Sequence, residues 1–173
     1  MALTNYAAAR PWAKAIRDQI LSRRMPPWGA VPGVREFAGD PSLLQPEIDM
    51  LAGWVEGGAP EGDAADLPAH LPVFKTQSPA LPRYTCTVTV TAETTLTKAG
   101  SLVAIGAKDV PAGGSLEAWA VEPDGTVERL LWIKDSRHTR QYTLLTPLAL
   151  PAGTRVRVAA TGGHVILYLG GRV

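Results

Sequence analysis

The hydrophobic period of this chain changes near residue 83, and this change limits the possible folds more than any other feature. Up to about residue 66, apolar residues recur every three or four positions, as on one face of a helix. From residue 83 onward, apolar and polar residues alternate, which is typical of half-buried strands. The pattern predicts an α+β fold, with a helical segment over 1–66, a proline-rich connector over 67–82 and an antiparallel β-sandwich over 83–173.

Two short helices are predicted in the first part. One carries Trp12, Ile16 and Ile20 at four-residue steps, and the proline pair after Met25 ends it. The other begins at about Gln45 and ends at a glycine pair. Two helices of this size bury little, so we expect some of their apolar side chains to remain uncovered by the segment itself. The residues expected to form this apolar patch are Trp12, Ile16, Trp28 and Trp54.

Turn residues divide the second part into about seven short strands. Glycine, proline and aspartate gather between the alternating runs, where they favour tight turns. Short strands at this spacing are typical of a β-sandwich. The candidate strands are Tyr84–Thr91, Ser101–Ala107, Ser115–Val121, Val127–Ile133, Arg140–Leu145, Thr154–Ala160 and His164–Leu169.

Charge and composition argue against several classes of function. The formal net charge is +1 and the basic residues are scattered, so no nucleic-acid partner is expected. No apolar run approaches the roughly 18 residues that a membrane span requires. Cys86 is the single cysteine, which excludes an internal disulfide. Its strand-like surroundings predict a buried, inert thiol.

Catalytic and metal-binding patterns are equally weak. The three histidines, His70, His138 and His164, form no closely spaced pair, so we expect surface or turn histidines rather than metal ligands. No Gly-x-Ser-x-Gly motif is present, and no glycine pair opens a helix as a phosphate loop would. The sequence therefore predicts a protein that is not an enzyme.

One short segment, Arg24-Met25-Pro26-Pro27-Trp28, has two interpretations. Met25 can be a core residue that closes a small apolar cluster with Trp28 and Trp54. It can also be a thioether held at fixed geometry to ligate a haem iron, which a loop stiffened by proline would suit. The residues alone leave both interpretations open.

A family resemblance covers residues 2–66. Three blocks follow one another there: Ala9-Arg10-Pro11-Trp12-Ala13-Lys14-Ala15-Ile16-Arg17, then Arg24-Met25-Pro26-Pro27-Trp28, then Glu47-Ile48 with Trp54-Val55-Glu56-Gly57-Gly58-Ala59-Pro60. Their order and spacing resemble the cytochrome c-like domains of a bacterial group of periplasmic haem proteins. Many members occur near the copper type II ascorbate-dependent monooxygenases. Leu130-Leu131-Trp132-Ile133 and the run from Tyr142 to Val156 look like the sandwich that follows in those proteins.

The resemblance carries over only one residue of the family's haem site. Met25 matches the position of the distal axial ligand, but the Cys-x-x-Cys-His motif and the proximal histidine are absent from this chain. The resemblance therefore implies that this chain holds no cofactor as given, whereas intact relatives carry haem c. The second part contains no methionine, so the copper chemistry of the monooxygenase-like members is not expected.

The resemblance implies a periplasmic or extracytoplasmic location, although the N-terminus has no signal peptide. Either an upstream part carrying the signal and the haem motif precedes Met1, or this lineage lost haem binding and kept the helices for docking. The expected function is a haem-less cytochrome c-like protein associated with electron transfer, with the sandwich as its partner-binding module. The alternative is a structural accessory or docking subunit of a larger periplasmic or membrane complex. Both functions require a protein partner.

Overall fold

The structure of the protein is a computed structural model that describes residues 3–66, 80–136 and 140–171. Most of the expected connector, residues 67–82, therefore lies outside the described residues. Its last three residues form neither helix nor strand.

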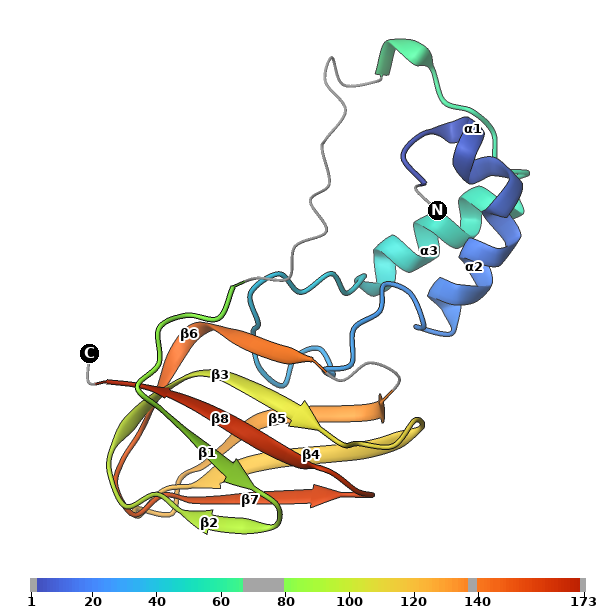
Figure 1. The fold of residues 1–173 in the computed structure, drawn as a ribbon. Helices are drawn as coiled ribbons and strands as arrows, with labels where there is room; N and C mark the ends of the chain where they lie inside the picture. The colour runs from blue at the N-terminus through green and yellow to red at the C-terminus, as the bar shows by residue number, and fades with distance from the viewer. Residues whose placement is uncertain (1–2, 67–79, 137–139, 172–173) are drawn as a thin grey trace. The chain divides into compact units, whose positions relative to one another are not determined.

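Two compact units make up the chain (Figure 1). The helical unit consists of Met1–Trp28 and Pro41–Gln77, and the β unit consists of Gly29–Asp40 and Ser78–Val173. The stretch Gly29–Asp40, hereafter the strap, belongs to the β unit although it separates two helices in the sequence. The sequence pattern had assigned these residues to the helical segment.

The first helices of the helical unit are short because the chain changes its hydrogen-bonding pattern at Pro11. Asn5 caps the first turn, since its side-chain oxygen accepts a hydrogen bond from the backbone N–H of Ala8 at 2.8 Å. A 3-10 turn then separates this turn from the main helix, which has only Ala13 and Ile20 buried. The elements are α1 (Tyr6–Ala9), η1 (Arg10–Trp12) and α2 (Ala13–Leu21).

The last helix of this unit, α3 (Gln45–Glu56), forms where the sequence predicts it. Its first turn contains a proline. Backbone N–H groups in the first turn have no acceptor within the helix, so the N–H that proline lacks costs no hydrogen bond there. The carboxylate of Glu47 accepts a hydrogen bond from the backbone N–H of Leu44 at 2.7 Å and fixes the start of the helix. Gly57 ends α3, and a short 3-10 turn, η2 (Ala64–Asp66), follows.

Eight strands of the β unit form two antiparallel four-stranded sheets (Figure 1). The strand order is β1-β8-β3-β6 in one sheet and β2-β7-β4-β5 in the other, which is the topology of a jelly roll. The strands are β1 (Cys86–Val90), β2 (Glu93–Thr95), β3 (Gly100–Lys108), β4 (Gly114–Val121), β5 (Val127–Ser136), β6 (Gln141–Leu150), β7 (Arg155–Ala160) and β8 (His164–Gly170).

The main core of the protein lies between the two sheets. Alternate residues point inward along β4, where Leu116, Ala118 and Ala120 are completely buried. Opposing inward residues come from the other sheet, with Ile105 of β3 and Leu167 of β8 also completely buried. This alternation is the reason why the sequence pattern located the strands.

The strap closes one side of the sandwich by pairing with an edge strand of each sheet. Near its start, the N–H of Val31 donates to the carbonyl of Trp132 on β5 at 2.8 Å. Near its end, the N–H of Ala38 donates to the carbonyl of Thr143 on β6, also at 2.8 Å. Between these points, Phe37 is buried and its ring lies 5.2 Å from the ring of Tyr142.

The expected fold class is wrong in its helical part. The protein has a β-rich fold of two four-stranded sheets with a few short helices, not a cytochrome c-like helical segment followed by a sandwich of about seven strands. The residues between α2 and α3 form no helix, because prolines and glycines interrupt that stretch. Part of the stretch instead completes the β unit as the strap. The eighth strand, β2, has only three residues, and all three are polar, so the sequence shows no apolar alternation there.

Candidate interaction surfaces

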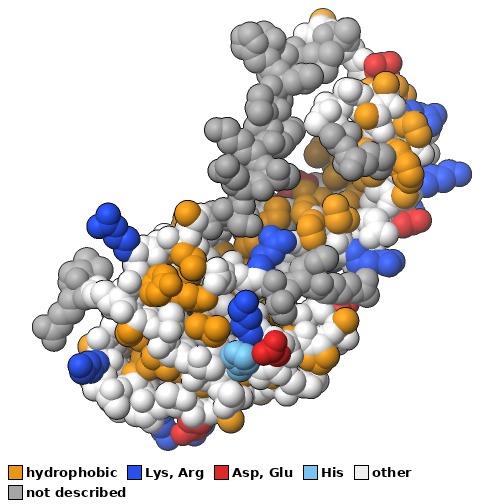
Figure 2. Space-filling model, in the orientation of Figure 1, with side chains coloured by type: hydrophobic (Ala, Val, Ile, Leu, Met, Phe, Trp, Pro, Cys, Tyr) orange, Lys and Arg blue, Asp and Glu red, His pale blue; other side chains and the backbone are white. Residues whose placement is uncertain are grey.

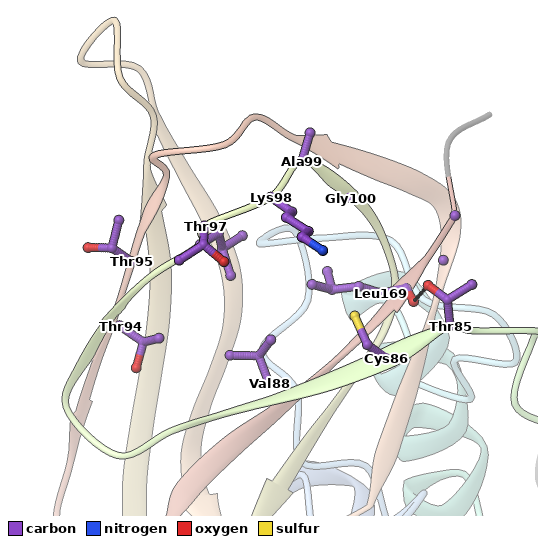
Figure 3. Close-up of a pocket in the computed structure, with 13 residues that line it drawn as sticks. Thr85, Cys86, Val88, Thr94, Thr95, Thr97, Lys98, Ala99, Gly100 and Leu169 are labelled. Atoms are coloured by element: carbon purple, nitrogen blue, oxygen red, sulfur yellow. Dashed lines mark hydrogen bonds between the residues drawn. The ribbon is translucent and has the colours of Figure 1, made fainter.

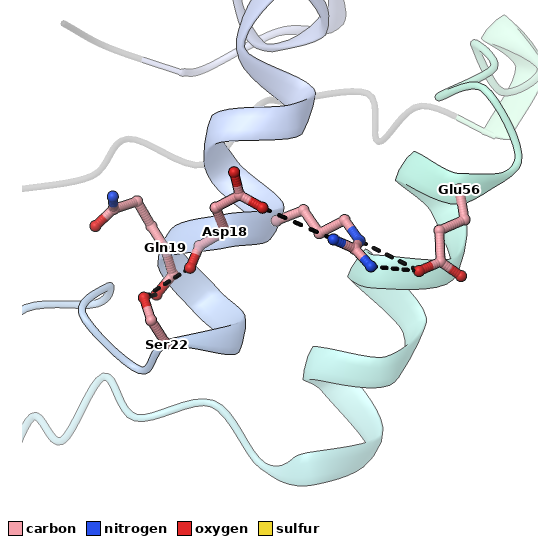
Figure 4. Close-up of polar contacts among 5 residues, drawn as sticks. Asp18, Gln19, Ser22 and Glu56 are labelled. Atoms are coloured by element: carbon pink, nitrogen blue, oxygen red, sulfur yellow. Dashed lines mark hydrogen bonds and ion pairs between the residues drawn. The ribbon is translucent and has the colours of Figure 1, made fainter.

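The helices α2 and α3 pack side by side in opposite directions. Arg17 of α2 forms an ion pair with Glu56 at the end of α3, at 2.6 Å (Figure 4). At the opposite end of the pair, the guanidinium of Arg23 donates to the side-chain oxygen of Gln45 at 2.7 Å. These contacts place the end of α2 beside the start of α3. Both are exposed polar contacts, so they fix orientation more than they stabilise the unit.

The helical unit exposes much of its apolar surface (Figure 2). Three exposed apolar side chains lie at the end of the helix pair where Arg23 contacts Gln45. We call Leu21, Met25 and Leu44 the apolar end; their exposed fractions are 46%, 48% and 68%. The buried side chains of the helical unit are Ala13, Ile20, Ile48, Ala52 and Ala59, which is a small core. The unit therefore presents apolar surface that its own residues do not cover.

The expected apolar patch agrees with these exposures. Trp12 is 47% exposed, and Ile16, Trp28 and Trp54 are only partly buried. Trp54 satisfies its indole N–H internally, by donating to the carbonyl of Pro60 at 2.9 Å. None of these four side chains is fully covered within the described residues.

The described residues of the helical unit offer Met25 no companion ligand for a haem iron. Met25 is exposed at the apolar end, and no histidine or cysteine occurs among the described residues of this unit. In the described part of the chain, no group of three histidine, cysteine, aspartate or glutamate side chains is placed to hold a metal ion.

Only one of the three histidines lies among the described residues. His70 and His138 lie outside the described residues. His164 begins β8, where its Nδ1 lies 3.5 Å from a carboxylate oxygen of Asp109. This exposed aspartate gives His164 a surface ion-pair partner when the imidazole is protonated, which resembles the surface role that the sequence predicts.

Three of the four strand edges of the sandwich are protected against further pairing. The strap covers the edges of β5 and β6. The edge strand β2 is only three residues long and carries a charged side chain, Glu93, which pairs with Arg157 of β7. Covering segments, short length and charge are devices that natural sheets use to prevent edge-to-edge association.

The fourth edge, that of β1, has none of these devices. Within the described residues β1 pairs only with β8, over five residues and with no register shift. It contains no charged residue and no proline. Thr87 and Thr89 are exposed on one face of the strand. Among the described residues, nothing therefore protects the β1 edge.

A groove with a cavity volume of about 530 Å³ lies between the edges of β1 and β2 (Figure 3). Cys86 and Val88 line it from β1, Thr94 from β2, and Lys98 from the loop before β3. Lys98 is the one charged residue in its lining. On the opposite side of the sandwich the strap occupies the corresponding position, so the groove marks the open side of the sandwich.

The burial expected for Cys86 is wrong, because its thiol is exposed at this groove. Cys86 lies two and four residues before the inward-facing Val88 and Val90 of β1. Because side chains alternate along a strand, Cys86 also faces the sandwich interior. The interior is open at this end of β1, where β2 is too short to cover it. Strand alternation gives the direction of a side chain but not whether another element lies above it. The sequence offered no signal for the open groove or for the strap.

No helix in the described part of the chain has the length and apolar character that crossing a membrane requires. A comparison of the chain with protein families, with curated proteins and with solved structures found no match. The resemblance to periplasmic cytochrome c-like proteins thus stays a prediction from the three sequence blocks.

Proposed function

We propose that this protein is a non-catalytic accessory subunit of a larger extracytoplasmic complex, and that its helical unit is the docking element. One observation carries the proposal. Of the described residues, nine large apolar side chains are at least 44% exposed, and six of them belong to the helical unit: Leu3, Trp12, Leu21, Met25, Leu44 and Met50. Exposed apolar surface at this density is typical of protein interaction sites.

The occupant that suits this surface is an apolar face of a protein partner. Trp12 supplies a large aromatic anchor, and the two exposed methionines supply flexible side chains that adapt to a partner's shape. The two arginines beside the apolar end are already hydrogen-bonded within the unit, Arg23 to Gln45 and Arg24 to Ser22. The electron-transfer role depended on a cytochrome-like helical segment, and the β-rich fold removes that support.

The experiment compares two matched double variants of the tagged protein in its own host. Leu21→Ser with Leu44→Ser removes apolar side chains from the apolar end. Val127→Ser with Leu145→Ser removes apolar side chains of similar mean exposure from the β unit, where the exposed fractions are 60% and 61%. We expect the first variant to lose a stoichiometric complex that the wild type and the second variant retain. Hydrogen exchange should also slow in α2 and α3 when the wild type is in the complex.

Two results would contradict the proposal. One is a complex that survives the apolar-end variant unchanged. The other is a protein that is isolated alone, with α2 and α3 exchanging at the same rate in the host extract and after purification. Circular dichroism of both variants checks that the β unit remains folded.

A further inference from the structure

We propose that the β1 edge is the interface of a homodimer, in which a second copy of the chain adds its own β1 in antiparallel orientation. The two β1-β8-β3-β6 sheets then form one continuous sheet of eight strands. This interface uses residues of the β unit alone, and the inference does not depend on the docking role of the helical unit.

The unprotected state of β1 is the first observation behind this inference. The strap covers β5 and β6, and β2 is short and charged, whereas β1 presents five residues without charge, proline or bulge. An edge of this kind pairs with another strand unless something prevents it. Pairing with a second copy about a two-fold axis uses both free edges at once and ends the association at the dimer.

The side-chain pattern of β1 is complementary to itself. Cys86, Val88 and Val90 face the sandwich interior, and Thr87 and Thr89 face away from it. Two copies can pair only with like faces together, because a shift by one residue would reverse every side chain. With the axis at Val88, Thr87 lies opposite Thr89 of the second copy, and such threonine pairs are favourable neighbours in antiparallel sheets.

The groove gives a reason for the second copy to remain bound. Cys86 is exposed and Val88 is half-buried, although both point to the inside of the sandwich. Leu169 of β8, beside Cys86 in the ladder, also lines the groove. A second copy at the β1 edge lies next to this opening and removes its apolar wall from water.

Sedimentation analysis of the full chain over a wide concentration range tests the proposal. We expect a concentration-dependent dimer for the wild type. The variant Thr87→Lys with Thr89→Lys places two lysine pairs face to face across the interface, and should weaken dimerisation roughly tenfold or more. The variant Thr87→Glu with Thr89→Glu should weaken it in the same way. An equimolar mixture of the two variants should restore dimers, because each lysine then faces a glutamate.

A control of equal charge is Thr126→Lys with Ala152→Lys, at two exposed turn positions away from β1. This variant should dimerise as the wild type does. Cys86, the single cysteine, supplies a second measurement, because its reaction with a thiol reagent should slow as the wild type dimerises and stay fast in the Thr87→Lys, Thr89→Lys variant.

The proposal is overturned by a wild type that stays monomeric at every concentration. It is also overturned by a dimer that the lysine variant leaves intact, or by variants of opposite charge that do not associate when mixed. Circular dichroism shows whether each variant is folded, so a loss of dimer through unfolding is recognised. A monomeric wild type whose β1 edge binds an extended segment of another protein would assign the edge to a different partner.

Discussion

Tyr142 is the largest completely buried side chain of the β unit, and it holds the strap to β6. Its ring lies against Phe37, and its phenol interacts with the backbone of Gly29. Burial raises the pKa of Tyr142 to about 12, because the phenolate would lose its hydration. The positive charge of Arg140 and the backbone of Gly29 lower this pKa, but by less than burial raises it.

This raised pKa predicts a specific loss of stability in alkali. The folded protein holds the Tyr142 proton more tightly than the unfolded chain does, so the unfolded chain ionises first as the pH rises above 10. The free energy of unfolding should therefore fall between pH 10 and pH 12, by about 3 kcal/mol at most. Urea unfolding of the wild type and of Tyr142→Phe measures this. If both lose stability equally over that range, Tyr142 is not the responsible group.

The buried side chain of Phe37 should contribute strongly to the stability with which the strap binds the sandwich. Only 5% of this residue is exposed, and its removal by Phe37→Ala leaves a cavity beside Tyr142. We expect the free energy of unfolding of the β unit to fall by about 3 kcal/mol or more. The control is Val127→Ala, which shortens a side chain that is 60% exposed and should change stability by less than about 0.5 kcal/mol. A small effect of Phe37→Ala would show that the strap contributes little to the β unit.

At the scale of elements, the strap also depends on Arg35. Its guanidinium forms a 2.7 Å ion pair with Glu128 and donates to the carbonyl of Arg129 at 2.9 Å. The Arg35 side chain is only 18% exposed, whereas Arg157, paired with Glu93 on β2, is 40% exposed. Arg35→Ala should therefore destabilise the β unit by about 1–2 kcal/mol, and Arg157→Ala by less than about 1 kcal/mol. Urea unfolding compares them, and equal effects would contradict this difference.

The sequence predicted elements well where one physical rule acts alone. Alternation located seven strands because burial between two sheets imposes a period of two. Gln45 and the glycine pair after Glu56 marked α3 correctly, since proline, glutamate and glycine fix helix ends locally. The strap escaped prediction because its strand-like pairing with β5 and β6 comes from tertiary contacts, and its glycines and prolines are typical of a loop. The exposure of Cys86 depended in the same way on the length of a neighbouring strand.

At the scale of the whole molecule, the two units differ in the size of their cores. Among its described residues the helical unit buries two isoleucines and three alanines, whereas the sandwich buries large aliphatic side chains from both sheets. A small core leaves a unit marginally stable on its own. Amide hydrogens in α2 and α3 should therefore exchange at least about a hundredfold faster than those of β3 and β8 in the isolated protein. Exchange measured by mass spectrometry tests this, and equal protection of both units would contradict it.

The strap also constrains the order in which the protein can form during synthesis. The ribosome releases residues 29–40 well before β5 and β6, which provide their hydrogen-bonding partners and the pocket for Phe37. About a hundred residues of chain separate the strap from Leu145, whose N–H donates to Glu36. At roughly 5–20 residues per second, the strap waits on the order of 5–20 s before it can dock. During that interval an apolar segment of the nascent chain is available to any chaperone that meets it.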